Sequence, residues 1–356
     1  MININNKHKN KYDKETYTQI KILGEGSFGK AYLVRSNLDN KEYVWKNIDL
    51  SKFDEKYKKY ALDEISVLKN CKHPNIILFK EAFIIKKPFI SLNLILEFAD
   101  NGDIQEQLRQ RKEKHEHFQE DQIINWLIQI CLALKYIHNL HVIHRDIKPS
   151  NIFLTKKGII KLGDFGISKV LSSKQINTNT FIGTPLFLSP EIINAEKYDY
   201  TADIWSLGVT FFELIYFALP FKGKSELGLY NNIINGIKNM SINESNEKIS
   251  YSKELIDIVN KMLSKNPKDR PNINEIFEVS IIKKYLKIFL EEHKSLYKDI
   301  ELSDKRKDVK VRSVDDINQK NEKLLTIISE NQDEKENFKD SNAFKTSNFF
   351  NSEFNK

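Results

Sequence analysis

The sequence contains few cysteines and no long uninterrupted hydrophobic segment. Its two cysteines, Cys71 and Cys131, both lie in apolar surroundings. This excludes a disulfide framework and a cysteine-rich metal site, and it is typical of buried thiols in a reducing compartment. The most apolar stretch, Leu207 to Phe221, is interrupted by Glu213, so we predict a core helix there and no membrane span. Residues 1–14 lack an apolar signal region. We therefore expect a soluble, cytoplasmic protein.

Charge of one sign is not concentrated in any block. The formal net charge is +7, and the charged content of 29% and hydrophobic content of 40% are ordinary for a globular protein. The lysines are spread along the chain, which predicts a solvated basic surface and not a nucleic-acid-binding segment. We find no internal repeats.

The apolar pattern changes along the chain and predicts an α+β fold. After a polar leader (1–16), short β-rich runs separated by turn residues extend to about residue 96, interrupted by one predicted helix from Lys56 to Asn70. Helical patterns dominate residues 103–288. A sheet-rich lobe at 17–96 and a helical lobe at 103–288 should therefore meet at a cleft beside the connector 97–102.

The carboxyl-terminal part of the sequence, 289–356, is rich in Lys, Glu, Asp, Asn and Ser. Such a composition offers little apolar surface to bury, so we expect a mostly disordered tail. Apolar residues at helical spacing leave a short amphipathic helix around 311–330 as the alternative.

One polar stretch stands out, His144-Arg145-Asp146-Ile147-Lys148-Pro149-Ser150-Asn151, directly after an apolar run at 126–143 that predicts a buried helix. A second acid follows in Asp164-Phe165-Gly166. Between them the pattern predicts a hairpin, with apolar residues at 152–154 and 159–160 around a turn at 156–158. The hairpin would let Asp146, Asn151 and Asp164 face one cavity. An acid that orients a hydroxyl, with an amide and an acid that hold magnesium, is the set of groups that phosphoryl transfer needs.

The motifs H-R-D-x-K-P-x-N and D-F-G, in this order and spacing, resemble the catalytic core of protein kinases. The resemblance implies a bilobal protein-kinase fold, ATP and Mg²⁺ as cofactors, and protein substrates. Asp146 would orient the substrate hydroxyl, Lys148 would steady the transferred phosphoryl group, and Asn151 and Asp164 would ligate Mg²⁺. Lys148 in the spacing D-x-K resembles the serine/threonine branch of the family.

The segment Gly24-Glu25-Gly26-Ser27-Phe28-Gly29 matches G-x-G-x-x-G. In a dinucleotide-binding fold this motif lies between a strand and a helix, whereas here it lies between two strand-like runs. A glycine turn between strands lets backbone amides approach the phosphates of ATP. Lys46, on the next strand, would reach these phosphates, and Glu64 on the predicted helix would hold Lys46 in an ion pair.

The kinase resemblance also assigns residues to the nucleotide base. Ala31 and Val44 would cover the adenine and Phe153 would lie beneath it. The backbone of Glu97-Phe98-Ala99 would recognise the adenine edge, with Leu96 as the gatekeeper. Asp103 would touch the ribose.

The kinase resemblance also implies a regulatory site and several contacts in the sequence that follows Asp164. Thr180, with Thr178 as second choice, is the expected activation phosphosite, because Arg145 and Lys169 offer a cationic pocket for a phosphate. Three structural contacts are also expected: a pair between Glu191 and Arg270, an acid at Asp203 that braces the catalytic loop, and a hydrogen bond from Thr184 near Asp146.

Finer matches resemble the NIMA-related kinases (NEK family): G-E-G-S-F-G-K-A at 24–31, G-D-F-G-I-S-K at 163–169 and G-T-P-x-x-L-S-P-E at 183–191. The resemblance spans about 17–288 and implies autophosphorylation and roles in the cell cycle, centrosomes, microtubules or cilia. Two other classes stay open. One is a pseudokinase scaffold that binds partners without transfer, and the other is a nucleotide-regulated structural module on microtubules.

Overall fold

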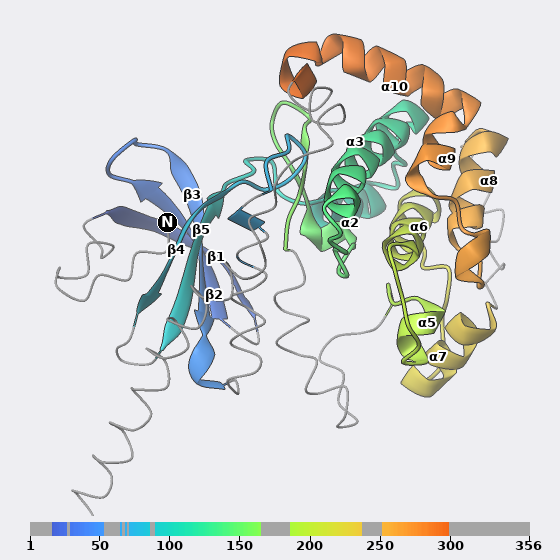
Figure 1. The fold of residues 1–356 in the computed structure, drawn as a ribbon, viewed down its shortest axis with the longest axis horizontal. Helices are drawn as coiled ribbons and strands as arrows, with labels where there is room; N and C mark the ends of the chain where they lie inside the picture. The colour runs from blue at the N-terminus through green and yellow to red at the C-terminus, as the bar shows by residue number, and fades with distance from the viewer. Residues whose placement is uncertain are drawn as a thin grey trace, which may run out of the picture.

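The computed structural model describes residues 16–26, 29–52, 65, 68–69, 71–85, 90–164, 186–236 and 251–298. Its amino-terminal part is a five-stranded antiparallel sheet with the strand order β1-β2-β3-β5-β4. The strands are β1 (Tyr17–Gly26), β2 (Gly29–Ser36), β3 (Glu42–Asp49), β4 (Phe79–Ile85) and β5 (Ser91–Glu97), with a single 3₁₀ turn, η1 (Leu50–Lys52), after β3. The sheet lies to one side of the helices in Figure 1.

The register of the sheet places Lys46 in its middle. Lys46 is paired with Ala31 of β2 on one side and with Leu94 of β5 on the other. Side chains alternate between the two faces of a strand, so Val44 and Lys46 share one face while Trp45 projects from the other. Trp45 packs there with Phe83, at 5.5 Å between ring centroids.

The carboxyl-terminal part is helical. It contains α2 (Ile104–Lys114), α3 (Glu120–Asn139), α5 (Pro190–Ile193), α6 (Thr201–Tyr216), α7 (Glu226–Asn235), α8 (Lys253–Met262), α9 (Ile273–Glu278) and α10 (Ser280–Glu292). The described residues of this part also form two short 3₁₀ turns, η2 (Pro149–Asn151) and η4 (Pro267–Asp269), and a hairpin of β6 (Ile152–Leu154) and β7 (Ile160–Leu162). The predicted α+β architecture is thereby confirmed.

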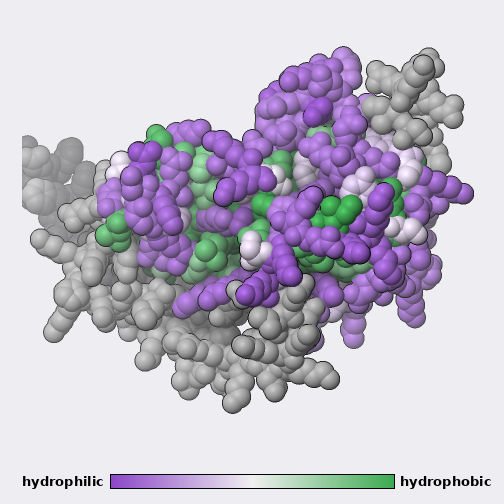
Figure 2. Space-filling view, turned by 90° about the horizontal axis from the view of Figure 1, so that it is seen from above, coloured by the Kyte–Doolittle hydropathy of each residue, from purple (hydrophilic) through white to green (hydrophobic). Residues whose placement is uncertain are grey.

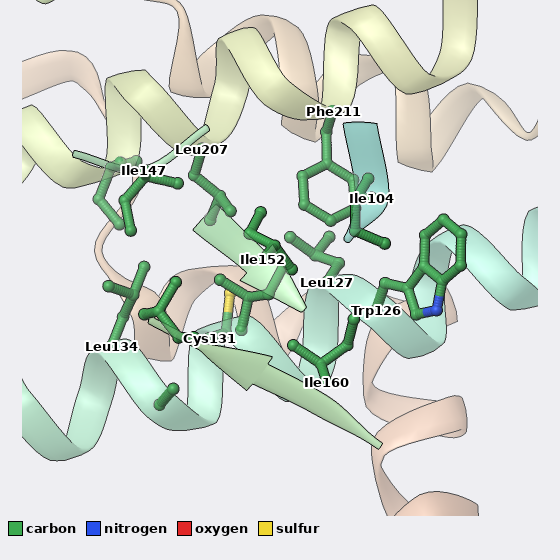
Figure 3. Close-up of a cluster of buried hydrophobic side chains, with 14 of the residues drawn as sticks. Ile104, Trp126, Leu127, Cys131, Leu134, Ile147, Ile152, Ile160, Leu207 and Phe211 are labelled. Carbon is green, nitrogen blue, oxygen red and sulfur yellow. The ribbon is translucent and has the colours of Figure 1, made fainter. Parts of the chain in front are cut away.

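The β6–β7 hairpin is fixed between two buried helices. Ile152 and Ile160 of the hairpin point into a cluster with Leu127 and Cys131 of α3 and Leu207 of α6 (Figure 3). All of these side chains are buried. Each apolar side chain of this size contributes about 1.5–3 kcal/mol when it is fully buried. This burial fixes the position of the hairpin and therefore of Asn151 before it and Asp164 after it.

The surface shows the opposite composition. Seen from above in Figure 2, most of the coloured face is hydrophilic, and apolar residues gather in its middle. Among the described helices, none is both long enough and apolar enough to cross a membrane.

One helix differs in its bounds from the sequence prediction. The helix predicted at 126–143 begins at Glu120 and ends at Asn139, because His141 adopts a left-handed backbone (φ 59°) that turns the chain toward the catalytic loop. The domain end at 288 stays a prediction; residue 288 lies inside α10, and Tyr297 beyond that helix is buried. Most of the predicted helix at 56–70, the leader 1–15 and the tail from 299, including 311–330, lie outside the described residues.

Candidate active site

Asp146 and Asn151 form the centre of the catalytic loop. The Nδ2 atom of Asn151 donates to Oδ2 of Asp146 at 2.7 Å and to the Asp146 carbonyl oxygen at 2.8 Å. Lys148 Nζ lies 2.9 Å from the same Oδ2 atom. Asn151 is buried, and the Asp146 side chain is 12% exposed. At least two donors thus hold the carboxylate, which stays slightly exposed, and its role toward an acceptor hydroxyl stays a prediction.

His144 and Gly163 join this loop to the strand that carries Asp164. The amide of Gly163 donates to the carbonyl of Asn151 at 3.0 Å. The Asp146 amide lies 3.3 Å from His144 Nδ1 and donates to it, so His144 Nε2 carries the proton and donates to the Gly163 carbonyl at 3.1 Å. Asp164 follows Gly163 directly. The three predicted oxygen-bearing residues therefore belong to one hydrogen-bonded unit.

Asp203 of α6 holds the loop backbone from below. Its two carboxylate oxygens accept the amides of His144 and Arg145, each at 2.8 Å. His138 Nε2 lies 2.9 Å from Asp203 Oδ2. Arg145 adopts φ 68°, in the left-handed region that is costly for a non-glycine residue. The kinase resemblance implied the brace by Asp203, and the structure shows that it holds the strained backbone at Arg145.

Lys46 meets Asp164 across the boundary between the sheet and the hairpin. Lys46 Nζ lies 2.6 Å from Asp164 Oδ1. Behind the pair lies a small cavity of about 20 Å³, which also contacts Leu68, Ile77, Leu94, Leu96 and Gly163. This volume is enough for about one water molecule. Asp164 has φ 51°, a second strained position beside the catalytic loop.

The glycine-rich turn joins β1 to β2. Gly24 and Glu25 lie in β1, and Glu25 makes an exposed ion pair with Lys30 at 3.1 Å. A Cβ atom on Gly29 would lie 1.8 Å from the Asn47 carbonyl oxygen, so packing of β2 on β3 requires glycine there. A Cβ atom on Gly24 would meet nothing within 4 Å. Packing within the described residues therefore gives no reason for glycine at 24, and the nucleotide contact expected there stays a prediction.

The connector between the two parts is tied at both ends. Glu97 closes β5, its amide donates to the Leu78 carbonyl at 2.8 Å, and its carboxylate lies 2.7 Å from Lys161 Nζ. At the other end, Asn101 donates to the carbonyl of Leu154 at 2.9 Å. Between them, Ala99 is buried, and its backbone makes no hydrogen bond within the described part of the chain. The peptide group of Ala99 therefore has hydrogen-bonding capacity that the described residues do not use.

Asp103 has a different contact from the one expected. Its carboxylate caps α2 by accepting the amide of Glu106 at 2.9 Å, and burial raises its pKa. Asp103 also forms a β-bridge with Phe153. The Asp103 position is therefore explained by helix capping, and a ribose contact stays a prediction.

Not every predicted site residue can be placed. Glu64, Ser27, Lys169, Thr178, Thr180 and Thr184 lie outside the described residues, so the ion pair of Lys46 with Glu64 and the activation pocket stay predictions. Glu191 and Arg270 form the expected pair, with two parallel bonds of 2.7 and 2.8 Å. Arg145 lies 5.7 Å from the ring centroid of Tyr198.

Two functional contacts were missed from the sequence. The first is the pair between Lys161 and Glu97, which joins residues far apart in the chain. The second is the packing of Gly163, where a Cβ atom would lie 2.8 Å from the Phe153 ring. The glycine before Asp164 was a possible signal for the second, because an unusual glycine in a strand often marks a close approach. No local pattern indicates the first.

Comparison with known proteins agrees with this geometry. The family profile of the protein kinase domain matches residues 17–282. The chain is 41% identical to the mouse serine/threonine-protein kinase Nek1 over 278 residues, covering 78% of this chain and 22% of Nek1. It is 38% identical to a putative serine/threonine-protein kinase A of Trypanosoma brucei brucei, covering 83% of this chain and 67% of that protein. It is also 38% identical to human Nek5, covering 76% of this chain and 38% of Nek5.

The chain thus spans about a fifth of the length of mouse Nek1 and about two thirds of the trypanosome protein. The similarity covers the sheet, the connector and the catalytic loop together, because the matched region begins at β1 and extends into α10. The chain belongs to the protein kinase family, and its kinase domain is homologous to those of the Nek serine/threonine kinases.

Proposed function

We propose that the protein transfers the γ-phosphoryl group of ATP to serine or threonine hydroxyl groups of protein substrates. The observation that carries this proposal is the hydrogen bond between Asn151 and Gly163. It links the pair of Asp146 and Asn151 to the pair of Lys46 and Asp164. A base for the acceptor hydroxyl and a cation for the phosphates thereby belong to one rigid unit, and positioning supplies most of the catalysis in phosphoryl transfer.

The residues of the site have separable tasks. The oxygen of the substrate hydroxyl bonds to the γ-phosphorus of ATP while Asp146 accepts the hydroxyl proton. At the same time the bond between the γ-phosphorus and the β-γ bridging oxygen breaks. Lys148, 2.9 Å from Asp146, stabilises negative charge on the transferred group. Lys46 turns its ammonium group from Asp164 to the nucleotide phosphates. ADP and the phosphorylated substrate are the products.

The donor groups present fit ATP and Mg²⁺. Asn151 Oδ1 and Asp164 Oδ2 accept no hydrogen bond within the described part of the chain, and oxygen atoms are the ligands that Mg²⁺ prefers. A bound Mg²⁺ would neutralise charge on the phosphate oxygens. The unpaired backbone of Ala99 and the open space around Gly24 suit the adenine edge and the phosphates, with Ala31, Val44 and Leu96 as apolar neighbours.

A single comparison tests the activity. The purified full chain is incubated with ATP, Mg²⁺ and casein, and incorporation of phosphate is compared for the wild type, Asp146→Asn and Asp257→Asn. Asp257 is exposed on α8, so its variant is the matched control. We expect transfer by the wild type and the control and a loss of about 1,000-fold or more for Asp146→Asn, as for removal of an essential group. Transfer that survives in Asp146→Asn would contradict the assigned role, and nucleotide binding without transfer by the wild type would favour a pseudokinase scaffold.

Regulation and cellular role extend this proposal. The homology to Nek kinases and the basic residue Arg145 beside Asp146 support activation by phosphorylation of Thr180 or Thr178. The homology to Nek kinases also supports a cytoplasmic protein that works in the cell cycle or on microtubules, centrosomes or cilia. Mapping of autophosphorylation sites, followed by Thr180→Ala and Thr178→Ala, tests the first point. Full turnover by both variants would exclude this form of regulation.

A further inference from the structure

Near the end of the described chain, Tyr297 makes a buried contact with Asn75, a residue far from it in the sequence. In Figure 1, α10 passes over α3, and its carboxyl-terminal end points toward the side of the sheet. After α10 ends at Glu292, Tyr297 is buried, with its ring 5.4 Å from that of Phe289 and 6.1 Å from that of His73. The Tyr297 hydroxyl donates to Oδ1 of Asn75 at 2.5 Å. Tyr297 lies beyond the region matched by the kinase family profile, which ends at 282.

Asn75 is buried, and each of its polar atoms makes a hydrogen bond. Its side-chain Nδ2 donates to Gln129 Oε1 at 2.8 Å and to the carbonyl of Ile160 at 3.0 Å. Its backbone carbonyl accepts the amide of Leu162 at 2.8 Å. The hydroxyl of Tyr297 is the donor to the remaining side-chain oxygen, so its loss would leave a fully buried oxygen without a partner.

The contacts of Asn75 also fix β7, the strand that leads to Asp164. Residue Ile76 forms a parallel bridge with Leu162, and the Ile77 amide donates to the Leu162 carbonyl at 2.9 Å. The segment 75–77 also leads directly into β4 of the sheet. It therefore lies beside β7 of the hairpin, joined to it by this bridge and these hydrogen bonds, just before the sheet begins. Gly163 and Asp164 follow Leu162 without any intervening residue.

We propose that Tyr297 is a positioning residue for phosphoryl transfer, which holds Asn75 and, through the bridge to Leu162, the position of Asp164. The inference depends on the proposed role of Asp164 and goes beyond it, because it makes the segment after α10 part of the active-site support. Deletion of this hydroxyl group shifts β7 relative to Lys46 and weakens the alignment of the nucleotide phosphates.

The test compares the full-length wild type with Tyr297→Phe and Tyr285→Phe. Tyr297→Phe keeps the ring that packs on Phe289 and His73. Tyr285 is half-buried on α10, and its hydroxyl makes no hydrogen bond within the described residues, which makes its variant the matched control. Circular dichroism and melting temperature establish that each variant is folded. Hydrogen exchange of peptides covering 71–77 and 158–164, kcat and the KM for ATP are then measured.

We expect faster exchange in both peptides for Tyr297→Phe alone, with exchange of α6 unchanged. We also expect kcat/KM for ATP to fall by roughly 2- to 30-fold, the usual range for coupling through a packed network. A purely structural contact would lower the melting temperature and leave these kinetic constants of the folded protein unchanged, and that result would overturn the proposal. Unchanged exchange would overturn it as well.

The wild-type control separates this proposal from the proposed function. If the wild type transfers no phosphate, the proposed function fails, and Mg²⁺-ADP binding measured by calorimetry then decides the role of Tyr297. Weaker binding by Tyr297→Phe than by Tyr285→Phe would support the positioning role, and equal binding would overturn it.

Discussion

Lys46 Nζ and Asp164 Oδ1 lie 2.6 Å apart, although β3 and the end of β7 belong to different parts of the domain. The pair is partly exposed, at 24% and 37%, so its direct contribution to stability is small. Its importance is geometric, because it joins β3 to Asp164, and the neighbouring Gly163 is hydrogen-bonded to Asn151.

We expect Lys46→Met to lower kcat/KM for ATP by roughly 100-fold or more, because the site loses the cation that contacts the phosphates. Stability should change little. Phosphate transfer by Lys46→Met is measured beside Lys30→Met, which removes the lysine of the exposed pair with Glu25. Near-normal transfer by Lys46→Met, or an equal loss in Lys30→Met, would contradict this role.

The glycines at 24 and 29 should respond differently to alanine. Gly29→Ala places a Cβ atom 1.8 Å from the Asn47 carbonyl, so it should lower the free energy of unfolding by about 2–3 kcal/mol. Gly24→Ala has open space and should stay within about 0.5 kcal/mol of the wild type while weakening ATP binding. Chemical denaturation and nucleotide titration measure the two effects. Equal stability losses would show that Gly24 is structural.

Glu191 should make stability depend on pH. Burial alone would raise the pKa of Glu191, but the hydrogen bonds and charge of Arg270 outweigh it and the pKa is lowered from 4.5. The ionised pair therefore stabilises the fold above about pH 4.5, and this contribution is lost as the pH falls through the lowered pKa of the folded state.

Glu191→Gln leaves the Arg270 charge buried and should cost about 3 kcal/mol at pH 7. The difference from the wild type should shrink as the pH falls below 4.5. Denaturation midpoints measured from pH 7 to pH 3 check this, with Glu291→Gln on the exposed face of α10 as the control. A difference that stays constant over this range would argue against the ion pair.

Both thiols should be unreactive in the folded protein. Burial raises the pKa of Cys71 to about 11 and shifts the pKa of Cys131 in the same direction, and the reactive species is the thiolate. We expect no labelling by iodoacetamide at neutral pH in the native state and labelling of both residues in denaturant. Rapid native labelling of Cys131 would contradict its place in the core between α3 and the hairpin.

Local sequence patterns predicted which helices and strands exist better than they predicted the residues at which these elements end. The strands β1 to β3 followed from β-rich runs between turn residues, and the hairpin followed from an apolar triplet at 152–154 and an apolar pair at 159–160 around a turn at 156–158. Apolar residues continue after α3 into Val142 and Ile143, so periodicity alone placed the helix end too late. Only the backbone turn at His141 separates the helix from a buried loop.

Contacts between distant residues could not be predicted without a family resemblance. The pairing of Glu191 with Arg270 and the brace by Asp203 were expected from known kinases, and the structure confirms both. The pairing of Tyr297 with Asn75 joins positions 222 residues apart, and neither residue belongs to the motifs on which the sequence predictions rest. Asp103 shows the converse, because a residue assigned to a ligand has a sufficient local reason in the first turn of α2.

The anchoring of the connector restricts how the two lobes can move. Lys161 and Leu78 hold Glu97, Leu154 holds Asn101, and the Asp100 carboxylate accepts the amide of Lys156 at 2.8 Å. Torsional freedom is left mainly at Phe98 and Ala99. Opening of the nucleotide cleft should therefore be a rotation about these two residues. The peptide group that would bind the adenine edge then lies on the rotation axis, where it moves least.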